Sequence, residues 1–370
     1  MRTAGRATAG ASLEELLTLA VPLLRQAQAR QQPRTGPGRK PLYEDWQVAT
    51  IILAGVIKRR KSKSAHFRMI AANADLFRRL LGREQLPGRS AFFERYKRVW
   101  PLVQEAIKLQ GRAALREHVA DAEAVAADKT LVAARGPVWH RRDRARGEVP
   151  KGLHGLDREA DWGYSDYDGW TWGYGMELVV TAPPKRSGFA AFPLLGSADA
   201  ASLNEQRAFA AKVPHLPAST RHVDVDKGYD GDGLADAVER RGPRPADPSL
   251  PWPFRSPRRH YLCPPRNGRV GVTAHRGARE AKRQRRLARV KFLRGRRGRA
   301  IYARRKTSVE PFNAILKQMF ELDEHVWLRG LDNNRTQLLM AVFCYQLLVR
   351  YNHKSCGRRD AQVQYLLDAV

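Results

Sequence analysis

The chain has 370 residues, 43% of them hydrophobic, which is enough to bury one large domain or two to three smaller ones and excludes wholesale disorder. Lysine and arginine number 67 against 37 aspartates and glutamates, and the formal net charge of +30 indicates a polyanionic partner, nucleic acid before any other. The three cysteines form no Cys-x-x-Cys pair, and the apolar runs at 48–57 and 338–349 are too short to cross a bilayer. We therefore expect a reduced, cytoplasmic protein with no membrane contact.

The first 117 residues are predicted to be helical. Residues 1–38 read as a leader followed by a linker with Pro and Gly, and residues 39–117 as several short helices. In the first of these helices, predicted at 41–60, apolar residues from Trp46 to Ile57 recur at helical spacing. Short helices with basic exposed faces are typical of a helix-turn-helix-like DNA-binding module and also of a bundle used for dimerisation, so both roles stay open.

The pattern changes in residues 118–352, and residues 353–370 follow as a tail. The predicted elements are, in order, strands ending at Asp128 and covering 170–181 and 189–195, a helix at 202–213, a strand at 222–226 and a helix at 233–240. Three successive strands followed by alternating helix and strand is the order of a ribonuclease-H-like core. The fold class expected is α/β, with a mixed sheet flanked by helices and a small all-α domain before it.

Two carboxylates, Asp226 and Glu310, lie at positions typical of catalytic or metal-binding groups, one at a strand end and one in the first turn of a helix. Asp226 ends a short alternating strand and precedes Lys-Gly-Tyr-Asp, and a carboxylate at a strand end before a glycine turn is how a sheet presents a metal ligand. Glu310 is in the first turn of a helix predicted at 307–322, which Thr307 or Ser308 can cap. At about 100° per residue, Glu310 and Lys317 share a face opposite the apolar stripe, which suits a metal and a phosphate. The plainer alternative is a glutamate that only favours the helix dipole.

A basic insertion at about 242–300 separates these two acids. It opens with prolines, and between Arg279 and Arg299 its only acidic residue is Glu280. Such a charge run is usually a solvated face or a flexible arm. Its position between two candidate catalytic groups favours phosphate binding instead.

Three blocks of the chain resemble a known family. They are Ala127-Asp128-Lys129-Thr130-Leu131-Val132, Asp226-Lys227-Gly228-Tyr229-Asp230 and Ser308-Val309-Glu310-Pro311-Phe312-Asn313-Ala314-Ile315-Leu316-Lys317. They look like the blocks of DDE transposases, in the bacterial insertion-sequence group whose catalytic glutamate lies in a Tyr-Arg-Glu-Lys helix. The similarity spans 121–348. The family pattern has arginine four residues before the glutamate, where this chain has Lys306. Arg305 is its neighbour, and Tyr302 is one residue off the usual spacing.

The resemblance implies a metal-dependent enzyme acting on DNA. Asp128, Asp226 and Glu310 would hold two Mg²⁺ ions, for which Mn²⁺ can substitute, because carboxylates are the hard oxygen ligands that Mg²⁺ prefers. The enzyme would cut double-stranded DNA at the terminal inverted repeats of its element and transfer the freed 3′-hydroxyl into target DNA, as a homodimer in the nucleoid. The residues implied at the DNA are Lys317, Arg305, Lys306, Tyr302, Lys227 and Trp252, the last as a base-stacking side chain.

Several alternatives stay open at this point. Asp224 points to the same sheet face as Asp226, and the other acids near the blocks are Asp121, Asp230 and Asp232. Trp139 and Trp172 are further stacking candidates, although a packed tryptophan is the commoner outcome. A nuclease that cuts without joining would use the same ligands. A DNA-binding protein with an inactive transposase-derived core would keep the fold without the reaction.

Overall fold

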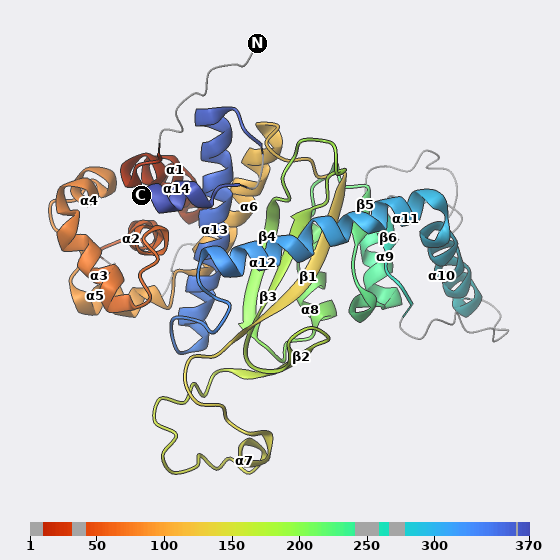
Figure 1. Cartoon of the computed structure of the whole chain (residues 1–370), viewed down its shortest axis with the longest axis horizontal. Helices are drawn as coiled ribbons and strands as arrows, with labels where there is room; N and C mark the ends of the chain where they lie inside the picture. Colours follow the sequence, from red (N-terminus) through yellow and green to blue (C-terminus); the bar gives the residue numbers. More distant parts are fainter. Residues whose placement is uncertain (1–9, 32–41, 241–258, 266–277, 360–361) are drawn as a thin grey trace.

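The computed structural model describes residues 10–31, 42–240, 259–265, 278–359 and 362–370, and the structural statements below concern these residues (Figure 1). An N-terminal helical part lies beside a larger part built on a sheet. Among the described residues, no helix is both long and apolar enough to span a membrane. Much of the predicted basic insertion, including Trp252, lies outside the described residues.

The N-terminal part is organised around one buried helix. All 13 residues of α2 (Asp45–Ile57) are buried. The helices packed on it are α1 (Leu13–Arg30), α3 (Lys63–Ala72), α5 (Arg89–Tyr96), α6 (Trp100–Arg116) and α13 (Leu331–Cys356). α4 (Ala74–Leu81) lies against α1 and α3, and α14 (Gln364–Ala369) returns to this part, where the ammonium of Lys58 donates to the carbonyl of Val370. DNA binding or dimerisation by this part stays a prediction.

A mixed sheet forms the larger part. Its strands lie in the order β2 (Asp161–Ser165), β3 (Gly169–Thr181), β1 (Ala124–Ala133), β5 (His222–Asp224) and β6 (His260–Leu262), and β4 (Pro193–Ala200) also pairs with β3. β1 and β4 run antiparallel to β3, whereas β5 is parallel to β1 and β6 is parallel to β5. The predicted ribonuclease-H-like α/β fold, with an all-α region before it, is confirmed.

Helices cover the sheet, and this explains the composition of its central strand. Val125, Ala126 and Ala127 are each 0% exposed, a continuous apolar run of the kind found where helices pack on a strand. α6 and α13 pack on β4, α8 (Glu205–Ala210) packs on β1 and β3, and α12 (Val309–Met319) crosses β1 and β3. The remaining helices are α7 (Arg141–Ala145), α9 (Asp232–Arg240), α10 (Ala278–Arg294) and α11 (Arg296–Tyr302).

The structure corrects three local predictions. β1 does not end at Asp128 but continues to Ala133, because residues 129–133 pair with β3. The ammonium of the half-buried Lys129 donates to the carbonyls of Ala201 and Leu203, at 2.6 and 2.7 Å. The strand predicted at 189–195 lies at Pro193–Ala200, where it pairs with β3.

The third correction concerns the cap of α12. Ser308 occupies the N-cap position of α12, but no side chain makes a capping hydrogen bond there, since the hydroxyls of Thr307 and Ser308 both donate to the carbonyl of Arg304, at 3.1 and 2.8 Å.

Candidate active site

The three predicted carboxylates converge on one arginine. Asp128 lies in the middle of β1, Asp226 lies two residues beyond the end of the neighbouring strand β5, and Glu310 lies in the first turn of α12. Arg305 donates through Nη2 to Oδ1 of Asp128 at 2.9 Å and through Nη1 to Oε1 of Glu310 at 2.7 Å. Asp226 is near enough to affect the pKa of both Asp128 and Arg305. The fold therefore brings together acids from three distant segments.

Arg305, and not Lys306, faces these acids. α11 ends at Tyr302, and a 3-10 turn over Ala303–Thr307 leads to Ser308, whose φ of −121° and ψ of −81° interrupt the helix before α12. This break takes up one residue more than the family spacing of four, so an arginine five positions before Glu310 reaches the carboxylates. The side chain of Lys306 is exposed.

Burial gives Asp128 an unusual electrostatic environment. Burial raises the pKa of Asp128 to about 6, the guanidinium of Arg305 opposes the increase, and the nearby Asp226 adds to it. The second carboxylate oxygen of Asp128 accepts a hydrogen bond from Nδ2 of Asn313 at 3.1 Å. Asn313 was not predicted; its position three residues after Glu310, nearly on the same helix face, is a signal that could have identified it.

Two further acids that the sequence analysis missed lie beside this centre. The carboxylates of Glu205 and Asp226 flank Gly228, where an added Cβ would lie 2.9 Å from Oδ1 of Asp226 and closer still to Glu205. Glu177 is buried under the same loop and accepts a hydrogen bond from the hydroxyl of Tyr229 at 2.7 Å. Burial raises the pKa of Glu177 to about 8. The glycine of the Asp-Lys-Gly-Tyr-Asp block is thus needed to let two carboxylates approach.

Of the alternative candidate acids, one is buried without a hydrogen-bond partner in the described part of the chain, one lies before β1, and two are paired with arginines of α10. Asp224 is 0% exposed, burial raises its pKa well above the usual range, and neither of its carboxylate oxygens accepts a hydrogen bond from the described residues. Asp121 precedes β1, at the opposite end of that strand, and accepts a hydrogen bond from the amide of Glu123. Asp230 and Asp232 form ion pairs with arginines of α10, at 2.6 and 3.0 Å.

Comparison with known proteins agrees with this geometry. A family model described as a transposase DDE domain matches residues 120–347, well over half of the chain. The chain belongs to the DDE transposase domain family. The matched segment begins just before β1 and ends within α13, so it includes all three converging acids. No curated protein and no solved structure matches the chain.

Members of the DDE transposase family normally use divalent metal ions, and the carboxylates here have the donor chemistry for such an ion, although not the arrangement that would hold it. Asp128, Asp226 and Glu310 offer hard oxygen ligands, and half-buried Asp128 requires a nearby positive charge. In the described parts of the chain, no group of three or more His, Cys, Asp and Glu side chains is arranged to hold a metal ion. Between Asp128 and Glu310 that positive charge comes from the guanidinium of Arg305.

Three other residues predicted at the DNA lie on segments that adjoin or carry Asp226, Arg305 and Glu310. Lys227 directly follows Asp226, is 61% exposed, and lies 3.1 Å from the carboxylate of Asp166. Lys317 lies two turns along α12 from Glu310, with its ammonium 3.9 Å from the carboxylate of Asp168. Tyr302 is half-buried near Arg305 and Asp226, and burial raises its pKa to about 12.

The tryptophans that were stacking candidates are packed or undescribed. Trp172 is 3% exposed and contacts Trp139, whose indole N–H donates to the carbonyl of Glu148 at 2.9 Å. Trp172 therefore belongs to the core of the transposase domain, and the partly buried Trp139 packs against that core.

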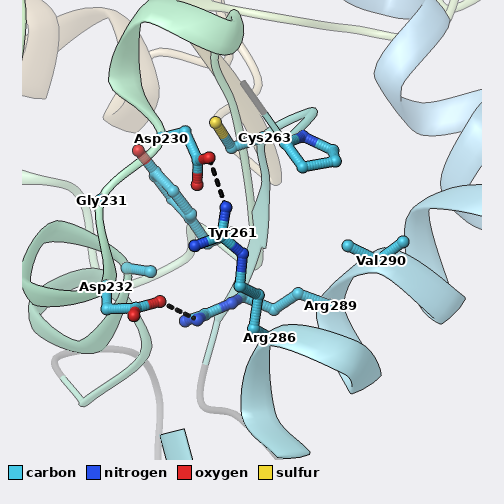
Figure 2. Close-up of a pocket in the computed structure, with 10 residues that line it drawn as sticks. Asp230, Gly231, Asp232, Tyr261, Cys263, Arg286, Arg289 and Val290 are labelled. Atoms are coloured by element: carbon cyan, nitrogen blue, oxygen red, sulfur yellow. Dashed lines mark hydrogen bonds and ion pairs between the residues drawn. The ribbon is translucent and has the colours of Figure 1, made fainter. Parts of the chain in front are cut away.

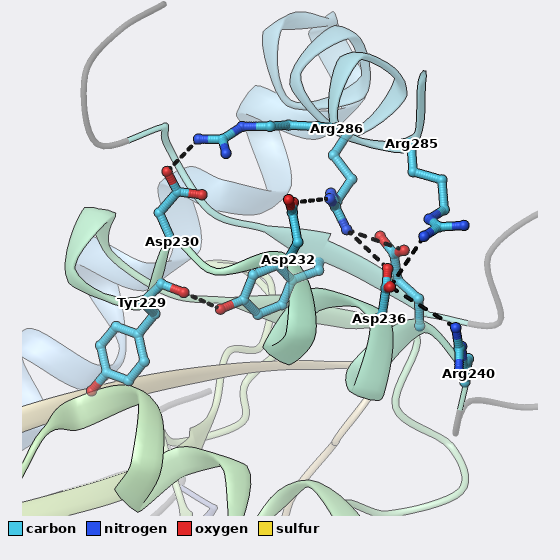
Figure 3. Close-up of polar contacts among 10 residues, drawn as sticks. Tyr229, Asp230, Asp232, Asp236, Arg240, Arg285 and Arg286 are labelled. Atoms are coloured by element: carbon cyan, nitrogen blue, oxygen red, sulfur yellow. Dashed lines mark hydrogen bonds and ion pairs between the residues drawn. The ribbon is translucent and has the colours of Figure 1, made fainter. Parts of the chain in front are cut away.

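Three arginines of α10, which we call the arginine clasp (Arg285, Arg286 and Arg289), fix the basic segment to the Asp226 loop and α9 (Figures 2 and 3). Arg286 pairs with Asp230 at 2.6 Å and Arg289 with Asp232 at 3.0 Å, beside the small pocket drawn in Figure 2. The run predicted as a phosphate-binding surface is therefore an ordered helix along this part of its length.

The clasp also uses two acids of α9, the half-buried Asp236 and the buried Glu239. Arg285 pairs with Asp236 at 3.1 Å (Figure 3), and Arg289 lies 3.4 Å from Glu239. Burial raises the pKa of Glu239 to about 7, and Arg289 opposes the increase. Because α10 continues through α11 into the turn that carries Arg305, the clasp links the loop of the second acid to the segment of the third.

Proposed function

We propose that this chain is a metal-dependent transposase that cuts DNA at the ends of an insertion sequence and transfers the freed 3′-hydroxyl into target DNA. The observation that carries the proposal is the convergence of Asp128, Asp226 and Glu310 around Arg305 in a chain of the DDE transposase family. Charge supports it, because the net +30 suits a nucleic-acid substrate.

In this proposal Asp128, Asp226 and Glu310 would hold two Mg²⁺ ions, or Mn²⁺ in their place. When bound, such ions activate the attacking water or 3′-hydroxyl and stabilise the leaving oxygen. Arg305 then exchanges its carboxylate contacts for a phosphate, which its planar guanidinium can bind through two hydrogen bonds. Asn313, which donates a hydrogen bond to the other carboxylate oxygen of Asp128, would keep that side chain oriented.

The remaining predicted residues bind DNA around the cut. Lys227, next to Asp226, and Lys317, on the same helix as Glu310, would bind phosphates as point charges. Tyr302 and Lys306, on either side of Arg305 in the chain, would add contacts. We further propose that two copies act together at the nucleoid, since transposition joins two element ends.

The test is cleavage of supercoiled DNA that carries the flanking terminal repeats, with Mg²⁺ or Mn²⁺. Asp128→Asn, Asp226→Asn and Glu310→Gln should each lower the rate by at least about 1,000-fold, because residues that act as a unit lose most of their effect together. Asp121→Asn, at the far end of β1, is the matched control and should cut like the parent. A pre-cut end with a free 3′-hydroxyl then tests joining.

Each other outcome identifies another function. Cutting without joining would make the chain a nuclease. DNA binding without cutting by the parent would make it a binding protein with an inactive core. If the three variants cut as well as the parent, the proposed acids are wrong.

A further inference from the structure

The turn between β2 and β3 exposes aromatic side chains. Among the described residues, five large hydrophobic side chains are exposed, and three of them lie in this short segment: Tyr164 at 54%, Tyr167 at 96% and Trp170 at 56%. Exposing so much aromatic surface at one place in a folded chain is unfavourable unless something covers it. We call these three residues the hairpin aromatics.

Ion pairs place the hairpin aromatics beside the candidate active site. The turn carries Asp166 and Asp168, which contact Lys227 at 3.1 Å and Lys317 at 3.9 Å. One of these lysines directly follows Asp226 and the other follows Glu310 along α12. The tip of the hairpin is therefore held within one lysine side chain of two of the three segments that supply the acids.

The hairpin is also ordered internally. Its turn is fixed by the amide of Asp168, which donates to the hydroxyl of Ser165 at 2.8 Å. Arg141 of α7 lies over Trp170, 3.4 Å from the ring centroid, and the ring of Tyr164 lies 5.1 Å from that of Trp170. These contacts hold Trp170 in place and leave Tyr167 at the tip with almost its whole side chain exposed.

This combination matches one kind of ligand. Aromatic faces combined with arginine and lysine bind unpaired nucleotides, because every base has a face that stacks and every nucleotide has a phosphate. The net charge of +30 favours a polyanion such as DNA as the partner of this surface.

We propose that Tyr167, supported by Trp170, stacks on a base that leaves the duplex beside the scissile phosphate. The inference rests on the proposed function, because it takes DNA as the substrate. It adds a base-binding position on the β2–β3 hairpin, before the second acid in the chain, and it assigns the stacking role to exposed side chains instead of the packed Trp139 and Trp172.

The test uses element-end duplexes with 2-aminopurine placed in turn at the nucleotides flanking the cut. This base fluoresces when it is unstacked and is quenched when it stacks on an aromatic ring. In the free duplex the base stacks on its neighbours and is dim. At one position Tyr167→Ala should make it bright, because the base leaves the duplex with no ring to stack on, whereas the parent and Tyr167→Phe should keep it dim. Cleavage by Tyr167→Ala should fall by about 5- to 100-fold, the range for losing one stacked base. Because Tyr167 is exposed, the alanine variant is expected to fold.

The inference and the proposed function fail in different ways. A parent that cuts, with equal rates and equal fluorescence for Tyr167→Ala, overturns the inference alone. If the parent never cuts DNA but the quenching still depends on Tyr167, the proposed cleavage activity is wrong and the base-stacking role of Tyr167 is supported. If Tyr167→Ala changes only the oligomeric state, measured by sedimentation without DNA, the tip contacts another copy of the chain and the inference is wrong.

Discussion

His66 should make the folded protein sensitive to acid. Its ring is 1% exposed in the N-terminal part, with ring centroids 5.8 Å from Tyr96 and 6.5 Å from Trp327. Nε2 lies 2.6 Å from the carbonyl oxygen of Arg60, so the neutral ring donates a hydrogen bond there. Burial lowers the pKa of His66 from 6.5 to about 4, and the Arg60 carbonyl opposes the decrease.

The sign and size of the effect follow from this shift. Since the folded pKa is below the unfolded value, the unfolded chain binds more protons between these pH values, and stability falls as the pH drops from 6.5 toward 4. At 1.36 kcal/mol per pH unit, the free energy of unfolding loses about 2 kcal/mol at pH 5 and about 3 kcal/mol at pH 4, relative to pH 7 and above.

The assay is urea unfolding of the parent and of His66→Gln at pH 7, 5 and 4. Glutamine does not ionise, and its amide can still donate to the Arg60 carbonyl. The variant should be the less stable protein at pH 7, through lost packing, and should gain about 3 kcal/mol relative to the parent by pH 4. His140→Gln, at an exposed histidine, should show no such change. An equal difference between parent and His66→Gln at pH 7 and pH 4 would refute the reasoning.

Two further predictions concern the sheet and its acids. In a double-mutant cycle of Arg305→Ala with Asp128→Asn, followed by urea unfolding without metal, the two changes should be coupled by about 1–3 kcal/mol because the side chains touch; purely additive effects would contradict this. Gly173→Ala should destabilise the fold by roughly 1–3 kcal/mol or more, because the added Cβ would meet the backbone of β1 at Val132. Gly233→Ala in α9, where the added Cβ would meet open space, should be neutral or stabilising. Equal effects of the two variants would show that β1 and β3 do not need a glycine at position 173.

Much of the fold and part of the site follow from local patterns. Continuous apolar residues before Asp128 predicted a buried strand, and the alternation before Asp226 predicted another that ends in a glycine turn. The apolar stripe of α12 placed Glu310 and Lys317 on its other face. These features depend on residues close together in the sequence, so periodicity and turn chemistry are enough to find them.

Tertiary contacts decided the rest. Sequence spacing left Arg305 and Lys306 as equal candidates, and a helix break at Ser308 turned Arg305 toward the acids. Asp224 and Asp226 share the same strand alternation, yet Asp224 is fully buried within β5 and Asp226 is half-buried beyond the end of that strand. The hairpin that carries Tyr167 reaches the site only through ion pairs to lysines far along the chain. Burial and partner choice arise from segments that meet only on folding, and no local pattern records them.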